Sequence, residues 1–133
     1  MPTHTSRSIL VACEQPLEAQ LMEGVLSAAG YAHVRATSDG REIARLHEKW
    51  PFDLLILDLS LSTKNAFQVL SELRATMESR RMGVLALSNV DDLEAQTRAL
   101  QAGVLDIFTR PTAQVTTLDL VRAALDNLSQ INA

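Results

Sequence analysis

The chain has 133 residues, a length that suits one domain built around a single hydrophobic core. Hydrophobic residues make up 47% of it but aromatic residues only 4%, which predicts an aliphatic core. A net charge of -4 without a basic run argues against nucleic acid as a direct partner. One cysteine excludes an intrachain disulfide, and the apolar runs are too short for a signal peptide or a membrane span. We therefore expect a soluble, cytoplasmic protein that does not engage a membrane.

The first half of the chain alternates short apolar runs with helical patterns. Residues 9–12 predict a strand, and Pro16 suits the first turn of the helix that follows. Gly30 is the expected C-cap of this helix. Its expected apolar stripe is Leu17, Leu21, Val25 and Ala28, with Met22 and Leu26 beside it. Residues 31–36 are a weaker strand candidate. The apolar face expected for the second helix, which ends at Pro51, is Ile43, Leu46 and Trp50.

The second half continues the same alternation. The third helix is expected to place on one stripe Phe67, Leu70, Leu73 and Met77. A strand over 83–87 comes next, followed by a helix over 91–102 with a thin apolar face of Leu93, Leu100 and alanines, and then a strand over 104–108. The last helix has as its apolar residues Leu118, Val121, Leu125 and Leu128. Five such alternations predict a flavodoxin-like α/β fold, a three-layer sandwich whose five-stranded sheet is parallel.

The central strand candidate, residues 53–57, is followed at once by Asp58. Its four consecutive large aliphatic residues do not alternate with polar ones, which indicates a strand buried on both faces. In open α/β sheets the chemistry lies outside the carboxyl ends of the strands. Taken alone, this stretch favours the explanation that Asp58 is a solvated residue that marks the end of the strand.

In a parallel sheet, that edge also gathers polar residues from the other strands. They are Cys13 and Glu14, Ser88, and Arg110. The carboxylates of Glu14 and Asp58 suit a hard divalent cation such as Mg²⁺, and a nearby cation and hydroxyl suit the oxygens of a phosphoryl group. A carboxylate can also act as the nucleophile in phosphoryl transfer, which gives an acyl phosphate.

Five segments in this order resemble the receiver domain of bacterial two-component response regulators. They are residues 9–16, 29–31, 39–42, 51–59 and 102–111. The resemblance extends from Ser8 to Leu128, so we expect residues 1–133 to form one receiver domain with its core at about 8–129. It implies a signalling domain rather than an enzyme. Its expected partner is a sensor histidine kinase or a phosphotransfer protein.

The resemblance also implies a role for each matched residue. Asp58 would accept the phosphoryl group, and Ser88 would be the switch hydroxyl that follows it. Glu14, Asp58 and the backbone carbonyl of Ser60 would bind Mg²⁺. Arg110 stands where the family has lysine, and its bond to Pro111 matches the family's usual cis peptide. Phosphorylation would bias the face made by the fourth helix, fifth strand and fifth helix, which is a candidate homodimer surface.

The sequence departs from the family pattern around the acceptor. Cys13 replaces the first acid of the metal-binding pair, and a neutral thiol is a poor partner for Mg²⁺, so we expect weakened binding. Arg110 keeps the positive charge, but its planar fork does not reproduce a compact ammonium. Ile107 stands in place of the usual switch aromatic, and Phe108, one residue on, should face the other side of the sheet.

Structural explanations compete for several of these residues. Ser88 with Asp91 also matches a capping box. Arg110 can serve simply to neutralise the acidic pocket by pairing with Asp58 or Glu14. Glu14 can be an acidic residue stabilised near a helix N-terminus, and Cys13 a small buried apolar residue.

Three functions remain open from the sequence. The first is a receiver phosphorylated on Asp58, and the second is a phosphorylation-independent pseudo-receiver that acts as a protein-interaction module. The replacements at Cys13, Ile107 and Arg110 support the second. The third is a flavodoxin-like or nucleotide-binding enzyme. The chain has no glycine-rich nucleotide loop after any expected strand and few aromatics to stack a flavin, which argues against the third.

Overall fold

The computed structural model describes residues 4–79 and 81–132, and within them the side chains up to residue 129. Its centre is a five-stranded parallel sheet in the order β2-β1-β3-β4-β5. The strands are β1 (Ser8–Ala12), β2 (His33–Thr37), β3 (Leu54–Asp58), β4 (Gly83–Asn89) and β5 (Asp106–Arg110). The predicted flavodoxin-like three-layer sandwich is confirmed, and the five-residue strand β3 is buried throughout.

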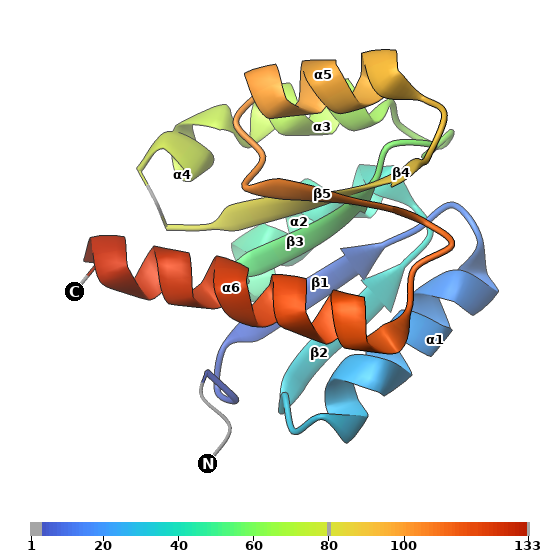
Figure 1. Cartoon of the computed structure of the whole chain (residues 1–133). Coiled ribbons are helices and arrows are strands. Elements are labelled where there is room, and N and C mark those ends of the chain that lie inside the picture. The colour runs from blue at the N-terminus through green and yellow to red at the C-terminus, as the bar shows by residue number, and fades with distance from the viewer. Residues whose placement is uncertain (1–3, 80, 133) are drawn as a thin grey trace.

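Helices cover both faces of the sheet (Figure 1). On one face lie α1 (Pro16–Ala28) and α6 (Gln114–Asn132). The other face carries the 3-10 turn η1 (Gly40–Glu42) and the helices α2 (Ile43–Lys49), α3 (Ala66–Glu72), α4 (Arg74–Glu78) and α5 (Leu93–Gln101). Each face has its own aliphatic core. Successive residues of β3 alternate between the two cores, with Leu55 and Leu57 in one and Leu54 and Ile56 in the other.

The apolar stripe expected for α1 through Leu17 and Leu21 is wrong, although Met22 and Leu26, which were expected beside it, are buried. Leu17 and Leu21 are 67% and 62% exposed, whereas the helix buries Ala19, Met22 and Leu26 against the sheet. The positions 19, 22 and 26 are spaced by three and four residues, so they form a helical stripe as regular as the expected one. The sequence offered two such stripes, and the smaller side chain of Ala19 permits the helix to approach the sheet closely.

Two other helices differ from expectation. The third helix is divided at Leu73 into α3 and α4, although Leu70, Leu73 and Met77 are buried as predicted. On α5 the expected alanine contact is confirmed, because Ala99 is buried, whereas the expected Leu93 and Leu100 are exposed.

The remaining elements agree in kind and differ in detail. Strand β5 begins two residues later than expected and runs to Arg110. Trp50 follows α2 and is 41% exposed, with the cationic groups of Arg35 and Lys49 over its ring at 3.9 and 4.6 Å. Among the helices that the structure describes, none has the length and apolar character needed to cross a membrane.

Candidate functional site

Asp58 ends β3 at the carboxyl edge of the sheet, and its side chain has no exposed surface. Its carboxylate is held by three donors. Oδ1 accepts a hydrogen bond from the backbone N–H of Ser60 at 2.9 Å. Oδ2 accepts from the backbone N–H of Glu14 at 2.9 Å and from Nη2 of Arg110 at 2.7 Å. A buried carboxylate needs such partners to stay charged, and here they come from the loops after β1 and β3 and from the end of β5.

Arg110 connects Asp58 to a second carboxylate, that of Glu18 on the first turn of α1. Nε donates to Glu18 Oε2 at 2.9 Å, and Nη2 donates to Oε1 at 2.6 Å. Nη1 donates to Oδ1 of Asn89 at 3.3 Å. The two-pronged bond to Glu18 is the main reason that the pKa of the Arg110 guanidinium lies above its ordinary value. The guanidinium is therefore a fixed positive charge between two carboxylates.

Sequence reasoning missed Glu18 and Asn89. It expected Arg110 to pair with Asp58 or Glu14; the pair with Asp58 is present, and the second acidic partner is Glu18 rather than Glu14. Asn89 reaches Arg110 because the two residues lie opposite each other in the β4–β5 register. Glu18 could have been found from its place on the first turn of a helix that starts at the carboxyl edge of the sheet.

Cys13 is fully buried beside these carboxylates, as expected of a small apolar residue. Desolvation raises the pKa of its thiol to about 12, with further contributions from Glu18 and Asp58. The group is a neutral thiol at physiological pH. One ligand atom each of Cys13, Glu18 and Asp58 lies within 4.8 Å of the others. Within the described part of the chain this is the one cluster of at least three such residues, and Glu14 is not in it.

Ser88 lies on β4 next to this edge and is buried. Its hydroxyl donates to the backbone carbonyl of Asn89 at 3.0 Å. The alternative capping box of Ser88 with Asp91 is wrong, because α5 begins at Leu93 and its N-cap is Asp92, whose side chain accepts from the N–H of Ala95. Ile107 and Phe108 pack on opposite faces of the sheet, as predicted from the strand period.

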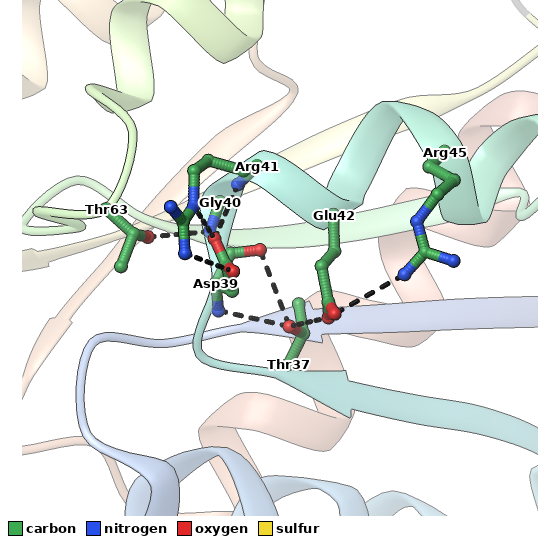
Figure 2. Close-up of polar contacts among 7 residues, drawn as sticks. All are labelled: Thr37, Asp39, Gly40, Arg41, Glu42, Arg45 and Thr63. Carbon is green, nitrogen blue, oxygen red and sulfur yellow. Dashed lines mark hydrogen bonds and ion pairs between the residues drawn. The ribbon is translucent and has the colours of Figure 1, made fainter.

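A hydrogen bond joins the loop after β3 to the turn after β2 (Figure 2). The backbone N–H of Gly40 donates to Oγ1 of Thr63 at 2.7 Å. Gly40 is buried, and a Cβ there would lie 3.1 Å from the Cβ of Lys64, so glycine permits this close approach. Within the turn, Asp39 caps η1, and Thr37 donates to Glu42 at 3.0 Å.

We expect Thr63→Val to destabilise the fold by about 1 kcal/mol, because it leaves the buried N–H of Gly40 without its acceptor. Urea unfolding at equilibrium measures the change. Thr63→Ser keeps the hydroxyl and is the matched control. Equal stability of the valine variant and the parent would show that this contact does not hold the loop.

The donor chemistry of the pocket fits a hard divalent cation in part. Carboxylate oxygens of Asp58 and Glu18 converge there, and oxygen is the ligand atom that Mg²⁺ prefers. The protonated Cys13 does not add a suitable ligand. Arg110 holds the same oxygens in the present structure, so a metal ion would have to compete with its guanidinium.

The buried Asp58 carboxylate thus lies at the carboxyl end of the central strand, paired with a cation from the last strand. The family model for the response regulator receiver domain matches residues 9–122, so the chain belongs to the response regulator receiver domain family of two-component systems. The peptide bond between Arg110 and Pro111 is cis, as the family resemblance implied.

Individual relatives agree with this assignment. The chain is 27% identical over 118 residues to response regulator RR06 of Streptococcus pneumoniae, an alignment that covers 89% of this chain and 52% of that protein. It is 33% identical over 108 residues to the transcriptional regulatory protein HprR of Escherichia coli, with 81% and 47% covered. The chain thus spans about half the length of the curated relatives it matches.

Solved structures show the same fold. The chemotaxis response regulator CheY4 of Vibrio cholerae superposes with a TM-score of 0.79 at 21% identity, covering 90% of this chain and 98% of that one. The signal receiver domain of a putative Luxo repressor protein from Vibrio parahaemolyticus gives a TM-score of 0.84 at 17% identity, covering 96% and 95%.

Proposed function

We propose that this receiver domain accepts a phosphoryl group on Asp58 from a sensor histidine kinase or a phosphotransfer protein. The observation that supports this most directly is the buried Asp58 carboxylate, which ends the central strand with the Arg110 guanidinium 2.7 Å away. A carboxylate oxygen attacks the phosphorus, the bond from phosphorus to the donor nitrogen breaks, and an acyl phosphate forms. The domain is a phosphoryl acceptor in signalling rather than an enzyme with a separate substrate.

The surrounding residues have the roles that phosphoryl transfer requires. Arg110 neutralises the oxygens of the incoming phosphoryl group. The buried Ser88 hydroxyl, which lies on β4 next to the strand of Arg110, is the switch hydroxyl that follows this group. The family resemblance implies that Mg²⁺ would be held by Asp58, Glu14 and the carbonyl of Ser60, where it would supply further charge neutralisation, but the carboxylate that lies next to Asp58 in this structure is that of Glu18. Because Asp58 has no exposed surface, Arg110 must move before any donor can reach it.

The output of this domain is a change at a protein-interaction surface. The face implied by the family resemblance consists of α5, β5 and α6, since the third helix is divided into α3 and α4. It exposes Leu93, Leu100 and Val115. These apolar side chains make it the candidate surface for a homodimer. We further propose that residues 1–133 form one receiver domain, with its core at about 8–129, that works in the cytoplasm.

The test is to incubate the protein with acetyl phosphate and Mg²⁺ and to measure its intact mass. We expect the parent to gain one phosphoryl group and Asp58→Asn to gain none, because an amide cannot form the acyl phosphate. Asp53→Asn is the matched control, since Asp53 lies at the opposite end of β3, and this variant should gain the group like the parent.

A kinase-dependent route is tested in the same way with a phosphorylated histidine phosphotransfer protein as the donor. If neither donor adds mass to the parent over a range of Mg²⁺ concentrations, the proposal is wrong. The phosphorylation-independent pseudo-receiver would then be the better account. A gain that persists in Asp58→Asn would place the acceptor elsewhere.

A further inference from the structure

The pocket around Asp58 lacks an acid where the family resemblance expects one, and Glu18 lies where its charge can replace it. Cys13, which stands in its place, is a fully buried free cysteine and offers sulfur rather than a carboxylate oxygen. The carboxylate of Glu18, from the first turn of α1, lies within 4.8 Å of both the Cys13 sulfur and the Asp58 carboxylate. The carboxylate that the family resemblance expects at position 13, in the loop after β1, is thus supplied by Glu18 on the helix that follows.

Glu18 already binds a cation in this structure, and that cation is the guanidinium of Arg110. The bonds of 2.9 and 2.6 Å to Glu18 and of 2.7 Å to Asp58 show that the two carboxylates can share one positive group. The Arg110 and Glu18 side chains are only 24% and 30% exposed, so this pair is partly shielded from solvent.

We propose that Glu18 is the second carboxylate of the divalent-cation site, and that a metal ion and the Arg110 guanidinium exchange on the Glu18–Asp58 pair. This inference rests on the proposed function, since it concerns the metal ion that phosphoryl transfer uses. In the metal-free state, Arg110 closes the pocket over Asp58. When a divalent cation takes the carboxylate oxygens, Arg110 is released from Glu18 and Asp58 gains a path to the donor.

Competition between Arg110 and the metal ion for the same oxygens predicts a result that simple charge repulsion does not predict. If Arg110 and the metal ion compete for the same oxygens of Glu18, removing Arg110 strengthens metal binding chiefly when Glu18 is present. If Arg110 acted only as a nearby positive charge, its removal would strengthen binding by about the same factor with or without Glu18. A double-mutant cycle separates these cases.

The experiment measures binding of Mn²⁺, as a paramagnetic substitute for Mg²⁺, from the signal of the free ion in electron paramagnetic resonance, without a phosphoryl donor. We expect Glu18→Gln to weaken binding at least about tenfold. Glu18→Asp, which keeps the charge, should retain most of the affinity. Glu23→Gln removes one negative charge from the same helix outside the site and should bind like the parent.

The cycle adds Arg110→Gln in the parent and in the Glu18→Gln background. We expect Arg110→Gln to strengthen Mn²⁺ binding at least about tenfold with Glu18 present, and by less than about threefold without it. Circular dichroism and thermal unfolding confirm that each variant is folded. Any variant that unfolds is replaced by the corresponding alanine variant.

Three results would overturn the inference. In the first, Glu18→Gln binds Mn²⁺ as tightly as the parent while Asp58→Asn loses binding. In the second, Arg110→Gln changes the Mn²⁺ affinity by the same factor with and without Glu18. In the third, the parent itself does not bind Mn²⁺. Each leaves the proposed function standing, because phosphorylation of Asp58 is decided by the mass measurement. Conversely, a parent that binds Mn²⁺ through Glu18 but never gains a phosphoryl group would refute the function alone.

Discussion

Arg110→Ala should destabilise the domain by about 3 kcal/mol at neutral pH, because it leaves the fully buried carboxylate of Asp58 without its counter-ion. Removing one partner of a buried ion pair costs far more than the net contribution of the pair. Two backbone N–H groups would still bind Asp58, which keeps the expected loss from being larger. Equilibrium unfolding in urea measures the difference.

Substitution of the other partner of this ion pair should have a smaller effect on stability. Asp58→Asn removes the buried charge and leaves Arg110 paired with Glu18, so we expect a change within about 1 kcal/mol. In the Asp58→Asn background, Arg110→Ala should cost much less than in the parent. If the two losses are the same in both backgrounds, Asp58 and Arg110 are not energetically coupled and the pair contributes little to the fold.

Cys13→Asp should raise the affinity for Mg²⁺ at least about tenfold, because it adds a carboxylate beside those of Glu18 and Asp58. Isothermal titration calorimetry measures the change. Without metal, the variant should be less stable than the parent, because position 13 is fully buried and the new charge adds to two carboxylates that share one guanidinium. Added Mg²⁺ should therefore raise its unfolding temperature more than that of the parent.

Cys13→Ser is the control for this substitution, since it changes the polarity of the side chain without adding a charge. It should bind Mg²⁺ like the parent. Unchanged affinity in Cys13→Asp would contradict the view that the thiol is what weakens the metal site. A gain in both variants would point to the removal of sulfur rather than to the added charge.

The sheet and the position of Asp58 were predictable because their signals are local. An unbroken aliphatic run identifies a strand buried on both faces, and the carboxyl edge of a parallel sheet then fixes the neighbourhood of Asp58, Ser88 and Arg110. The structure brings these residues together as expected. The switch of faces between Ile107 and Phe108 was predictable from the strand period alone.

The helix faces and the partner of Arg110 were not predictable, because they depend on how each helix turns toward the sheet. On α1 the stripes through Leu17 and through Ala19 have the same period, and only packing selects the second. That selection also decides where Glu18 points. The ion pair between Glu18 and Arg110 joins residues 92 positions apart. The place of Glu18 in the first turn of α1 could have located it at this edge of the sheet, but could not have shown that it pairs with Arg110.

Borohydride trapping identifies the residue that carries the phosphoryl group, and we expect that residue to be Asp58. Borohydride reduces an acyl phosphate to the alcohol with release of phosphate, so a phosphorylated aspartate becomes homoserine. Trypsin cleavage after Lys49 and Lys64 gives fragment 50–64, which contains Asp53 and Asp58. We predict that fragmentation of this peptide by mass spectrometry places homoserine at position 58. Homoserine at position 53 or in another fragment, or none after treatment with a phosphoryl donor and Mg²⁺, would contradict the account.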